Sequence, residues 1–137
     1  MSSFTQQAAT VGAHHIGLTV PDIEASANFF IELLGWQEVG RKDEYPAVFI
    51  SDGVIMLTLW QCQQMDAMNS FNNKTNIGLH HLALAVESRD MLDKIQSAVA
   101  NSGLEIEFAP ECLGDGPAVH MMCFEPGGNR IEFIFPG

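Results

Sequence analysis

The sequence contains few basic residues: 6 Lys and Arg stand against 17 Asp and Glu, which gives a formal net charge of −11. A protein that binds nucleic acid or an anionic membrane surface needs a basic face, so we expect neither partner. No apolar run approaches the ~20 residues needed to span a bilayer. The sequence therefore predicts no membrane-spanning segment.

Cysteine is also scarce. Cys62, Cys112 and Cys123 are the only three, and no two of them form a C-x-x-C pair. An odd number at wide spacing does not favour a disulfide framework or a cysteine-rich zinc site, so we expect a reduced, cytoplasmic protein. At 137 residues and 47% hydrophobic composition, the chain is long enough to form one domain with its own core.

An internal repeat organises the chain. Residues 14–20, HHIGLTV, recur 66 residues later as HHLALAV. Each copy is followed by a helical pattern that begins after Asp22 or Ser88 and ends at Gly35 or Gly103. Three strand-like runs then follow each helix, at 36–41, 47–50 and 54–60, and at 104–109, 118–124 and 130–135. We therefore predict an α+β fold of two βαβββ modules.

The expected boundaries follow from the repeat. The first module spans about residues 12–61 and the second about 77–136, within a single domain over 1–137. Residues 62–76 connect the two modules, and 65–68 are expected to form a helical turn. This connection is long for a loop inside a domain.

Strand alternation predicts which way the histidines point. In the first copy, Ile16, Leu18 and Val20 share one face, and His15 lies on the other with small neighbours. In the second copy His81 occupies the same position. Because each helix must cover the apolar face, both histidines are expected on the open face, with room for a ligand.

Glu132 is predicted to be a buried carboxylate, because it lies between apolar residues in the last strand. A buried carboxylate needs a partner. Two imidazoles and one carboxylate suit a divalent transition metal with open coordination positions, although a histidine on a strand is also commonly a hydrogen-bonded structural residue. His120, in the preceding strand, is a candidate general base or a structural histidine.

These features resemble the vicinal oxygen chelate superfamily, which includes glyoxalase I, bleomycin and fosfomycin resistance proteins and extradiol dioxygenases. The resemblance covers about residues 12–136, and the stretch EPGGNRIE at 125–132 is its most specific piece. It implies curled mixed sheets that enclose a metal cavity, formed within one chain or between chains, and we expect the protein to be a homodimer. It also implies that His15, His81 and Glu132 hold one divalent ion: iron, manganese, nickel, cobalt or zinc.

The sequence departs from each well-known activity of that superfamily. Glyoxalase I has a fourth ligand, a Glu in the last strand of the first module, and we expect Met56 at that position. Extradiol dioxygenases use a Tyr from the second module, whereas the only tyrosine here is Tyr45. Fosfomycin thiol transferases need a Thr where this chain has Gly17. Bleomycin-type binders usually lack the metal ligands, which this chain retains.

The resemblance implies a metal-dependent enzyme, a glyoxalase-like lyase or isomerase related to lactoylglutathione lyase. Its substrate would be a small metabolite chelated through two oxygens. Glu132 and His120 are the expected catalytic residues, and Met56, Thr58 and Trp60 are expected to line the substrate cavity. Two alternatives remain open: an extradiol-type ring-cleaving dioxygenase, and a binding protein that sequesters a ligand without catalysis.

Overall fold

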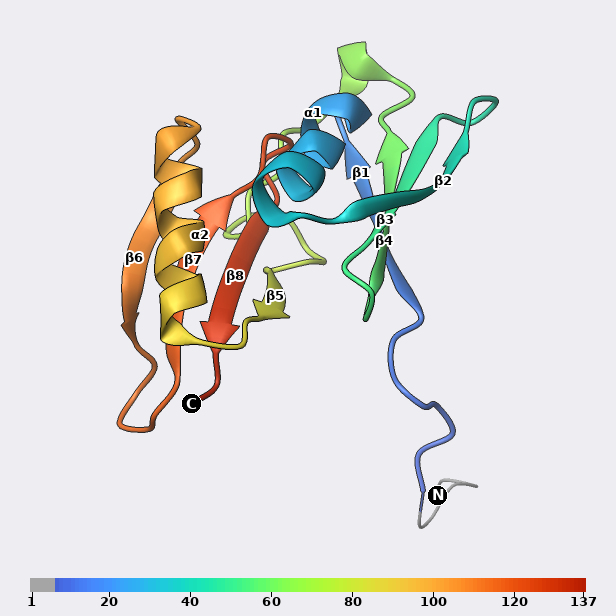
Figure 1. Ribbon diagram of the computed structural model, residues 1–137. Coiled ribbons are helices and arrows are strands. Elements are labelled where there is room, and N and C mark those ends of the chain that lie inside the picture. The colour runs from blue at the N-terminus through green and yellow to red at the C-terminus, as the bar shows by residue number, and fades with distance from the viewer. Residues whose placement is uncertain (1–6) are drawn as a thin grey trace.

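The computed structural model describes residues 7–137 and contains two modules with the same order of elements (Figure 1). The first module contains β1 (His15–Val20), α1 (Ile23–Asn28), β2 (Gln37–Lys42), β3 (Ala47–Ser51) and β4 (Met56–Gln61). The second contains β5 (Leu82–Ala85), α2 (Arg89–Asn101), β6 (Ile106–Cys112), β7 (Val119–Phe124) and β8 (Arg130–Phe135). The predicted α+β fold of two βαβββ modules is confirmed.

Each module forms one four-stranded mixed sheet. Sheet one has the order β1-β4-β3-β2, and sheet two has the matching order β5-β8-β7-β6. The first strand of each module runs parallel to the last, and the remaining pairs are antiparallel. Neither sheet closes on itself, so β1 and β5 are both edge strands.

The helices begin where the sequence predicts. The Asp22 side chain accepts hydrogen bonds from the backbone N–H groups of Glu24 and Ala25, which caps α1. The Ser88 hydroxyl accepts one from Met91 N and caps α2. The first helix differs from the expectation in its second half, where α1 changes into a π-helical turn at Phe29–Leu33. Phe29 and Phe30 are both buried in that wider turn.

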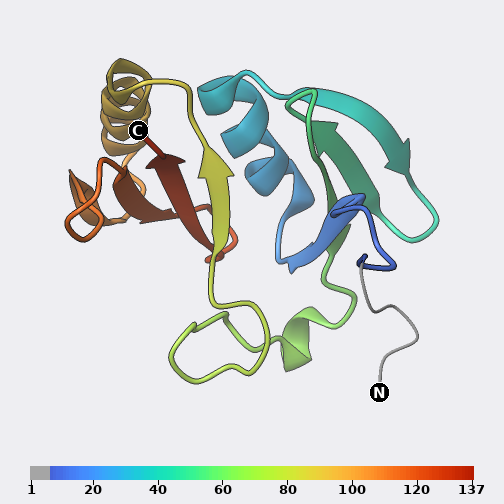
Figure 2. The same cartoon turned by 90° about the horizontal axis from the view of Figure 1, so that it is seen from below.

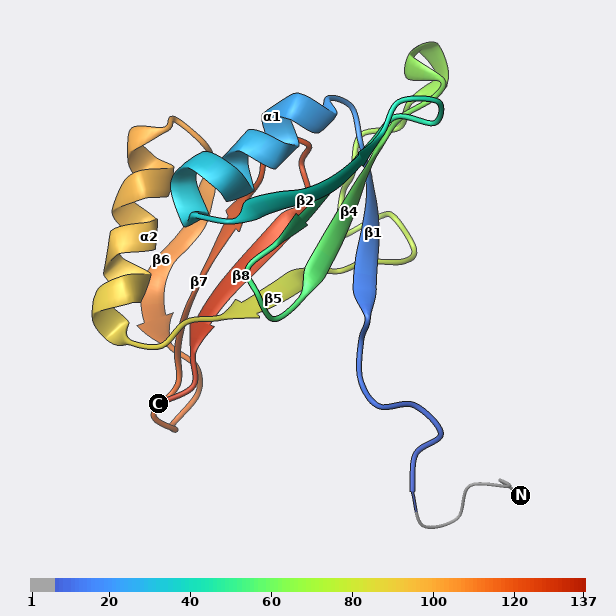
Figure 3. The ribbon, with the colours of Figure 1, turned by 45° about the vertical axis from the view of Figure 1, so that its right-hand side comes forward.

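The helices cover one face of each sheet, and the buried apolar side chains of both modules form one core. Figure 2 shows α1 between the strands of sheet one and β5, and α2, which contacts the end of the first helix, lies on the same side over sheet two. Figure 3 shows β1 at the edge of sheet one that lies away from α2. The opposite face of each sheet carries no helix, and we call it the open face.

The open faces show the predicted alternation. In β1, Leu18 and Val20 are buried while His15 and Thr19 are exposed, and β5 alternates in the same way. The connection between the modules contains a single 3-10 turn at Met65–Ala67, where a helical turn was expected. Within residues 7–137, no helix is long and apolar enough to cross a membrane.

Candidate metal centre

Glu132 lies on the open face of sheet two and is only 8% exposed. Both of its carboxylate oxygens have an imidazole partner. His81 Nε2 lies 3.2 Å from Oε1, and His120 Nδ1 lies 2.5 Å from Oε2. The buried carboxylate was expected to need one partner, and it has two, His81 and His120.

The strand register explains how these three side chains meet. Glu132 on β8 lies beside Ala83 on β5 and beside Met122 on β7. Because Ala83 is small, the side chain of His81, two residues earlier on the same face, can reach across to the carboxylate. His120 approaches diagonally from β7, and its ring packs against Phe108 with the ring centroids 4.9 Å apart.

The chemistry of this pair fits a divalent metal ion. Two donors that each lie about 2.1 Å from one ion are about 3.0–3.4 Å apart for right-angled to tetrahedral coordination. The separation of His81 Nε2 and Glu132 Oε1 is 3.2 Å. An imidazole with a carboxylate is a donor set used by iron, manganese, cobalt, nickel and zinc. His81 and Glu132 are therefore suited to two adjacent positions on one ion.

The three side chains do not by themselves make a complete metal site. The two imidazoles approach different oxygens of Glu132, so the three donors do not converge on one point. Over residues 7–137, no group of three or more His, Cys, Asp or Glu side chains is arranged to hold a metal ion. A metal ion bound here would need at least one further ligand.

His15, the third predicted ligand, lies on sheet one. It is exposed, and its Nδ1 is 2.8 Å from Nδ1 of the neighbouring His14. His80 and His81 make the same contact in the second module, also at 2.8 Å. The structure therefore brings Glu132, His81 and His120 together, and it leaves His15 with the predicted cavity residues Met56, Thr58 and Trp60 on the other open face.

The strand register corrects one expectation about the first module. Met56 was expected at the position of the fourth glyoxalase I ligand, a Glu in the last strand of the first module. In sheet two Glu132 pairs with Ala83, two residues after His81, and in sheet one the residue that pairs with Gly17, two after His15, is Thr58. Met56 pairs with His15 itself. Thr58 is thus the counterpart of Glu132, and its hydroxyl accepts a hydrogen bond from Trp60 Nε1 at 2.9 Å.

Sequence reasoning missed the surroundings of Trp60. The rings of Tyr45 and Phe49 pack against the indole, with centroid distances of 5.3 and 6.0 Å. Lys42 Nζ lies 5.8 Å from the centre of the Trp60 ring. Tyr45 lies in a turn, and Lys42 and Phe49 lie on different strands. No spacing in the sequence signals their contact, which depends on how β2, β3 and β4 pair.

Comparisons with known proteins agree with this architecture. The family model described as "Glyoxalase/Bleomycin resistance protein/Dioxygenase superfamily" matches residues 12–133. The uncharacterised protein YqjT of Bacillus subtilis is 26% identical over 129 residues, which cover 90% of this chain and 98% of that protein.

Two solved structures share the fold. A glyoxylase/bleomycin resistance protein/dioxygenase domain from Frankia has a TM-score of 0.80 at 23% identity, with 94% of each chain covered. Lactoylglutathione lyase from Agrobacterium tumefaciens has a TM-score of 0.71 at 18% identity, covering 93% of this chain and 96% of that one. At these identities the structures show a common fold, and the family match spans most of the sequence. The chain belongs to the glyoxalase/bleomycin resistance protein/dioxygenase superfamily.

Proposed function

We propose that the protein is a metal-dependent lyase or isomerase of the glyoxalase type, acting on a small metabolite that is chelated through two oxygens. The observation that carries this proposal is the buried Glu132 with His81 at 3.2 Å. Membership of the glyoxalase/bleomycin resistance protein/dioxygenase superfamily supports the proposal, and a lactoylglutathione lyase shares the fold. When bound, a divalent ion would act as a Lewis acid toward the substrate's oxygens.

We assign His81 and Glu132 as two of the metal ligands and His15 as the third. Because His15 and Glu132 lie on the open faces of different sheets, the proposal includes a homodimer in which His15 of a second copy completes the site. Both β1 and β5 are edge strands with unpaired backbone groups, which are suited to meeting another copy. Each dimer would then hold two equivalent sites.

Proton transfer is the task proposed for Glu132 and His120. An isomerase or lyase of this type must remove a proton from one carbon and deliver it to a neighbouring atom. The first module contributes no carboxylate at the position equivalent to Glu132, because Thr58 stands there. His120 is in contact with Glu132 and is the second group able to accept and return a proton.

His120 also favours a second candidate, the extradiol-type ring-cleaving dioxygenase. That reaction uses a two-His, one-carboxylate iron site and an acid–base group beside it. This chain has no tyrosine in the second module, but His120 lies on the same open face as Glu132. The identity of the bound metal separates the two candidates, since only the dioxygenase requires iron.

The first test is metal content. We expect the protein, purified without chelators under anaerobic conditions, to contain a near-stoichiometric divalent metal by elemental mass spectrometry. His81→Ala and Glu132→Gln should lose metal affinity by at least about tenfold. Glu105→Gln, a matched change at an exposed carboxylate of the same module, should retain it. Protein that stays free of metal after reloading, yet still binds metabolites, would favour the ligand-sequestering alternative.

A further inference from the structure

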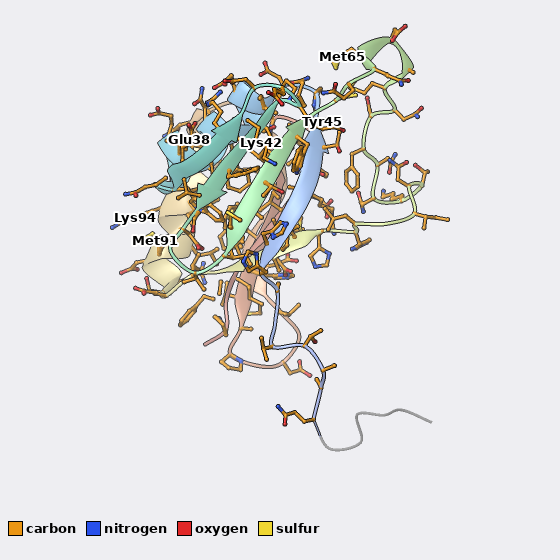
Figure 4. The ribbon with its side chains drawn as sticks, turned by 90° about the vertical axis from the view of Figure 1, so that its right-hand side faces the viewer. Glu38, Lys42, Tyr45, Met65, Met91 and Lys94 are labelled. Carbon is orange, nitrogen blue, oxygen red and sulfur yellow. The ribbon has the colours of Figure 1, made fainter. Side chains whose placement is uncertain are left out.

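Four side chains gather on the open face of sheet one: Lys42, Tyr45, Phe49 and Trp60, which we call the aromatic cluster. Trp60 contacts both other rings, with centroid distances of 5.3 Å to Tyr45 and 6.0 Å to Phe49. Lys42 Nζ lies 5.8 Å from the Trp60 ring centre and 5.9 Å from that of Phe49. Figure 4, which looks onto sheet one, shows Lys42 and Tyr45 close together on it.

The cluster adjoins the position of His15. A Cβ placed on Gly17 would lie 3.4 Å from Trp60 Nε1 and 3.1 Å from Thr58 Oγ1. The indole therefore lies over Gly17. Gly17 is two residues after His15 on the same face of β1, about 7 Å along the strand. A small molecule bound next to His15 would have the Trp60 ring as its neighbour.

Lys42 carries a charge that no described carboxylate neutralises. The three arginines are all paired, Arg41 with Glu24 and Glu38, Arg89 with Asp93 and Arg130 with Glu107. Lys42 has no ion pair with any carboxylate of residues 7–137, in a chain whose formal net charge is −11. The two aromatic rings hold its ammonium group through cation–π contacts, and its N–H donors remain available to an anion.

The repeat shows that the fold does not require this arrangement. Trp60 and Phe49 on sheet one correspond in register to Ile134 and Met122 on sheet two. The second module thus has aliphatic side chains where the first has aromatic rings. Tyr45 also lines a cavity of about 740 Å³, together with Thr19, Phe71 and the 126–129 turn. One member of the cluster, Tyr45, therefore borders space that a ligand can occupy.

We propose that the aromatic cluster binds the part of the substrate that does not chelate the metal, and that this part is a planar anion such as an aromatic carboxylate. The planar group stacks on Trp60, and its carboxylate meets the Lys42 ammonium. This inference rests on the proposed function only for the position of the part of the substrate that chelates the metal. Binding of a planar anion to the cluster itself does not require a metal.

The test uses the metal-free full-length protein and naphthalene-2-carboxylate as the probe, with binding measured by isothermal titration calorimetry. We expect Lys42→Met to weaken binding about tenfold, the loss of one charge-assisted contact, and Trp60→Leu to weaken it about fivefold. Lys94→Met, which removes an exposed charge from α2, should leave binding unchanged. The neutral naphthalene-2-carboxamide should bind the wild-type protein about tenfold more weakly than the acid.

Two outcomes would overturn the inference. One is a wild-type protein that does not bind the probe, or binds it equally well as Lys42→Met. The other is a change in the sedimentation coefficient of Lys42→Met without a change in probe affinity, which would make the cluster a contact between copies. Metal content measured on the same samples keeps the two proposals separate. A protein that binds metal but not the probe contradicts this inference alone, and one that binds the probe but no metal contradicts the proposed function alone.

Discussion

Glu132 is a buried carboxylate whose two oxygens contact His81 and His120. Burying such a group without partners would cost several kcal/mol, so the imidazoles are part of the reason that the carboxylate can stand in β8 at all. The same imidazoles also determine which group each carboxylate oxygen can meet. An ion that binds His81 and Glu132 leaves His120 on the second oxygen, where it can exchange a proton with the carboxylate.

Arg130 lies two residues before Glu132 and is also buried, but its partner is another residue. Its guanidinium donates to both carboxylate oxygens of Glu107 on β6, at 3.0 and 2.6 Å. The hydrogen bond from Arg130 holds the pKa of the Glu107 carboxyl below its ordinary value of 4.5, with a smaller Coulombic contribution from the same guanidinium. This bidentate pair neutralises the cation nearest to the site.

Stability should depend on pH through this pair. A carboxyl whose pKa is lowered in the folded protein stabilises it above the pKa of the unfolded chain, and this stabilisation is lost as the pH falls through the lowered value. We expect Glu107→Gln to reduce the free energy of unfolding by about 1–2 kcal/mol at neutral pH, because Arg130 loses the negative charge of its partner. Solvent around the half-exposed Glu107 side chain keeps this loss modest. The difference from wild type should shrink as the pH falls below 4.5.

Urea unfolding at neutral pH and at about pH 3 measures this difference, with the sign worked out by linkage. Glu111→Gln, on the same strand, is the control, since Glu111 makes no ion pair within residues 7–137. A Glu107→Gln deficit that is as large in acid as at neutral pH would show that the pair does not contribute in this way.

Among the elements, the turn before β8 has the clearest structural role. The Glu125 carboxylate accepts hydrogen bonds from Gly127 N, from Asn129 N and Nδ2, and from the Ser26 hydroxyl on α1. One buried carboxylate thus shapes the turn and ties it to the helix of the other module. These bonds account for Glu125, Gly127 and Asn129 of the EPGGNRIE stretch, in the turn that leads into β8 and Glu132.

Gly127 is predicted to tolerate no side chain. A Cβ there would lie 2.5 Å from Glu125 Oε1 and 3.1 Å from both Ser26 Oγ and Val20 Cγ1. We expect Gly127→Ala to lower the free energy of unfolding by about 1–3 kcal/mol, the usual cost of overpacking. Gly116→Ala is the matched control, because nothing lies within 4 Å of its added Cβ, and it should leave stability unchanged or raise it by less than ~1 kcal/mol. Equal stability of the two variants in urea would contradict this role.

Much of the element order could be predicted from the sequence, because the repeat and the alternation of β1 and β5 carry it directly. Some boundaries could not. The strand expected from residue 54 begins at Met56, because the Asp52 side chain accepts hydrogen bonds from Val54 N and Ile55 N and holds both residues in a turn. In sheet two, the strand expected to end at residue 109 continues to Cys112 as β6. It includes Pro110, which is tolerated because β6 is an edge strand.

The candidate site was predictable to the extent that it depends on which face a residue occupies. Period-two alternation placed Glu132 and His81 on one open face. Alternation does not give the register between strands, so it could not show that Thr58, and not Met56, is the counterpart of Glu132. The Lys42 contact and the Glu107 partner of Arg130 also depend on register, and the sequence did not indicate them.

At the scale of the whole molecule, the proposed metal ligands lie on two different sheets. Sheet two carries Glu132 with two imidazoles, and sheet one carries His15 beside the aromatic cluster. This division suits a dimer in which sheet one of one copy faces sheet two of the other. Every site would then combine a metal-binding half from one chain with a substrate-binding half from its neighbour.

The most direct test of this arrangement is subunit complementation. His15→Ala and His81→Ala are purified separately, mixed under conditions that exchange subunits, and analysed for metal content. Each variant alone should hold almost no metal. In a mixed dimer one of the two sites receives an intact His15 from one chain and an intact His81 and Glu132 from the other, so the random mixture should recover about a quarter of the wild-type metal. A wild-type protein that binds metal, beside a mixture that recovers none, would contradict a site shared between two copies.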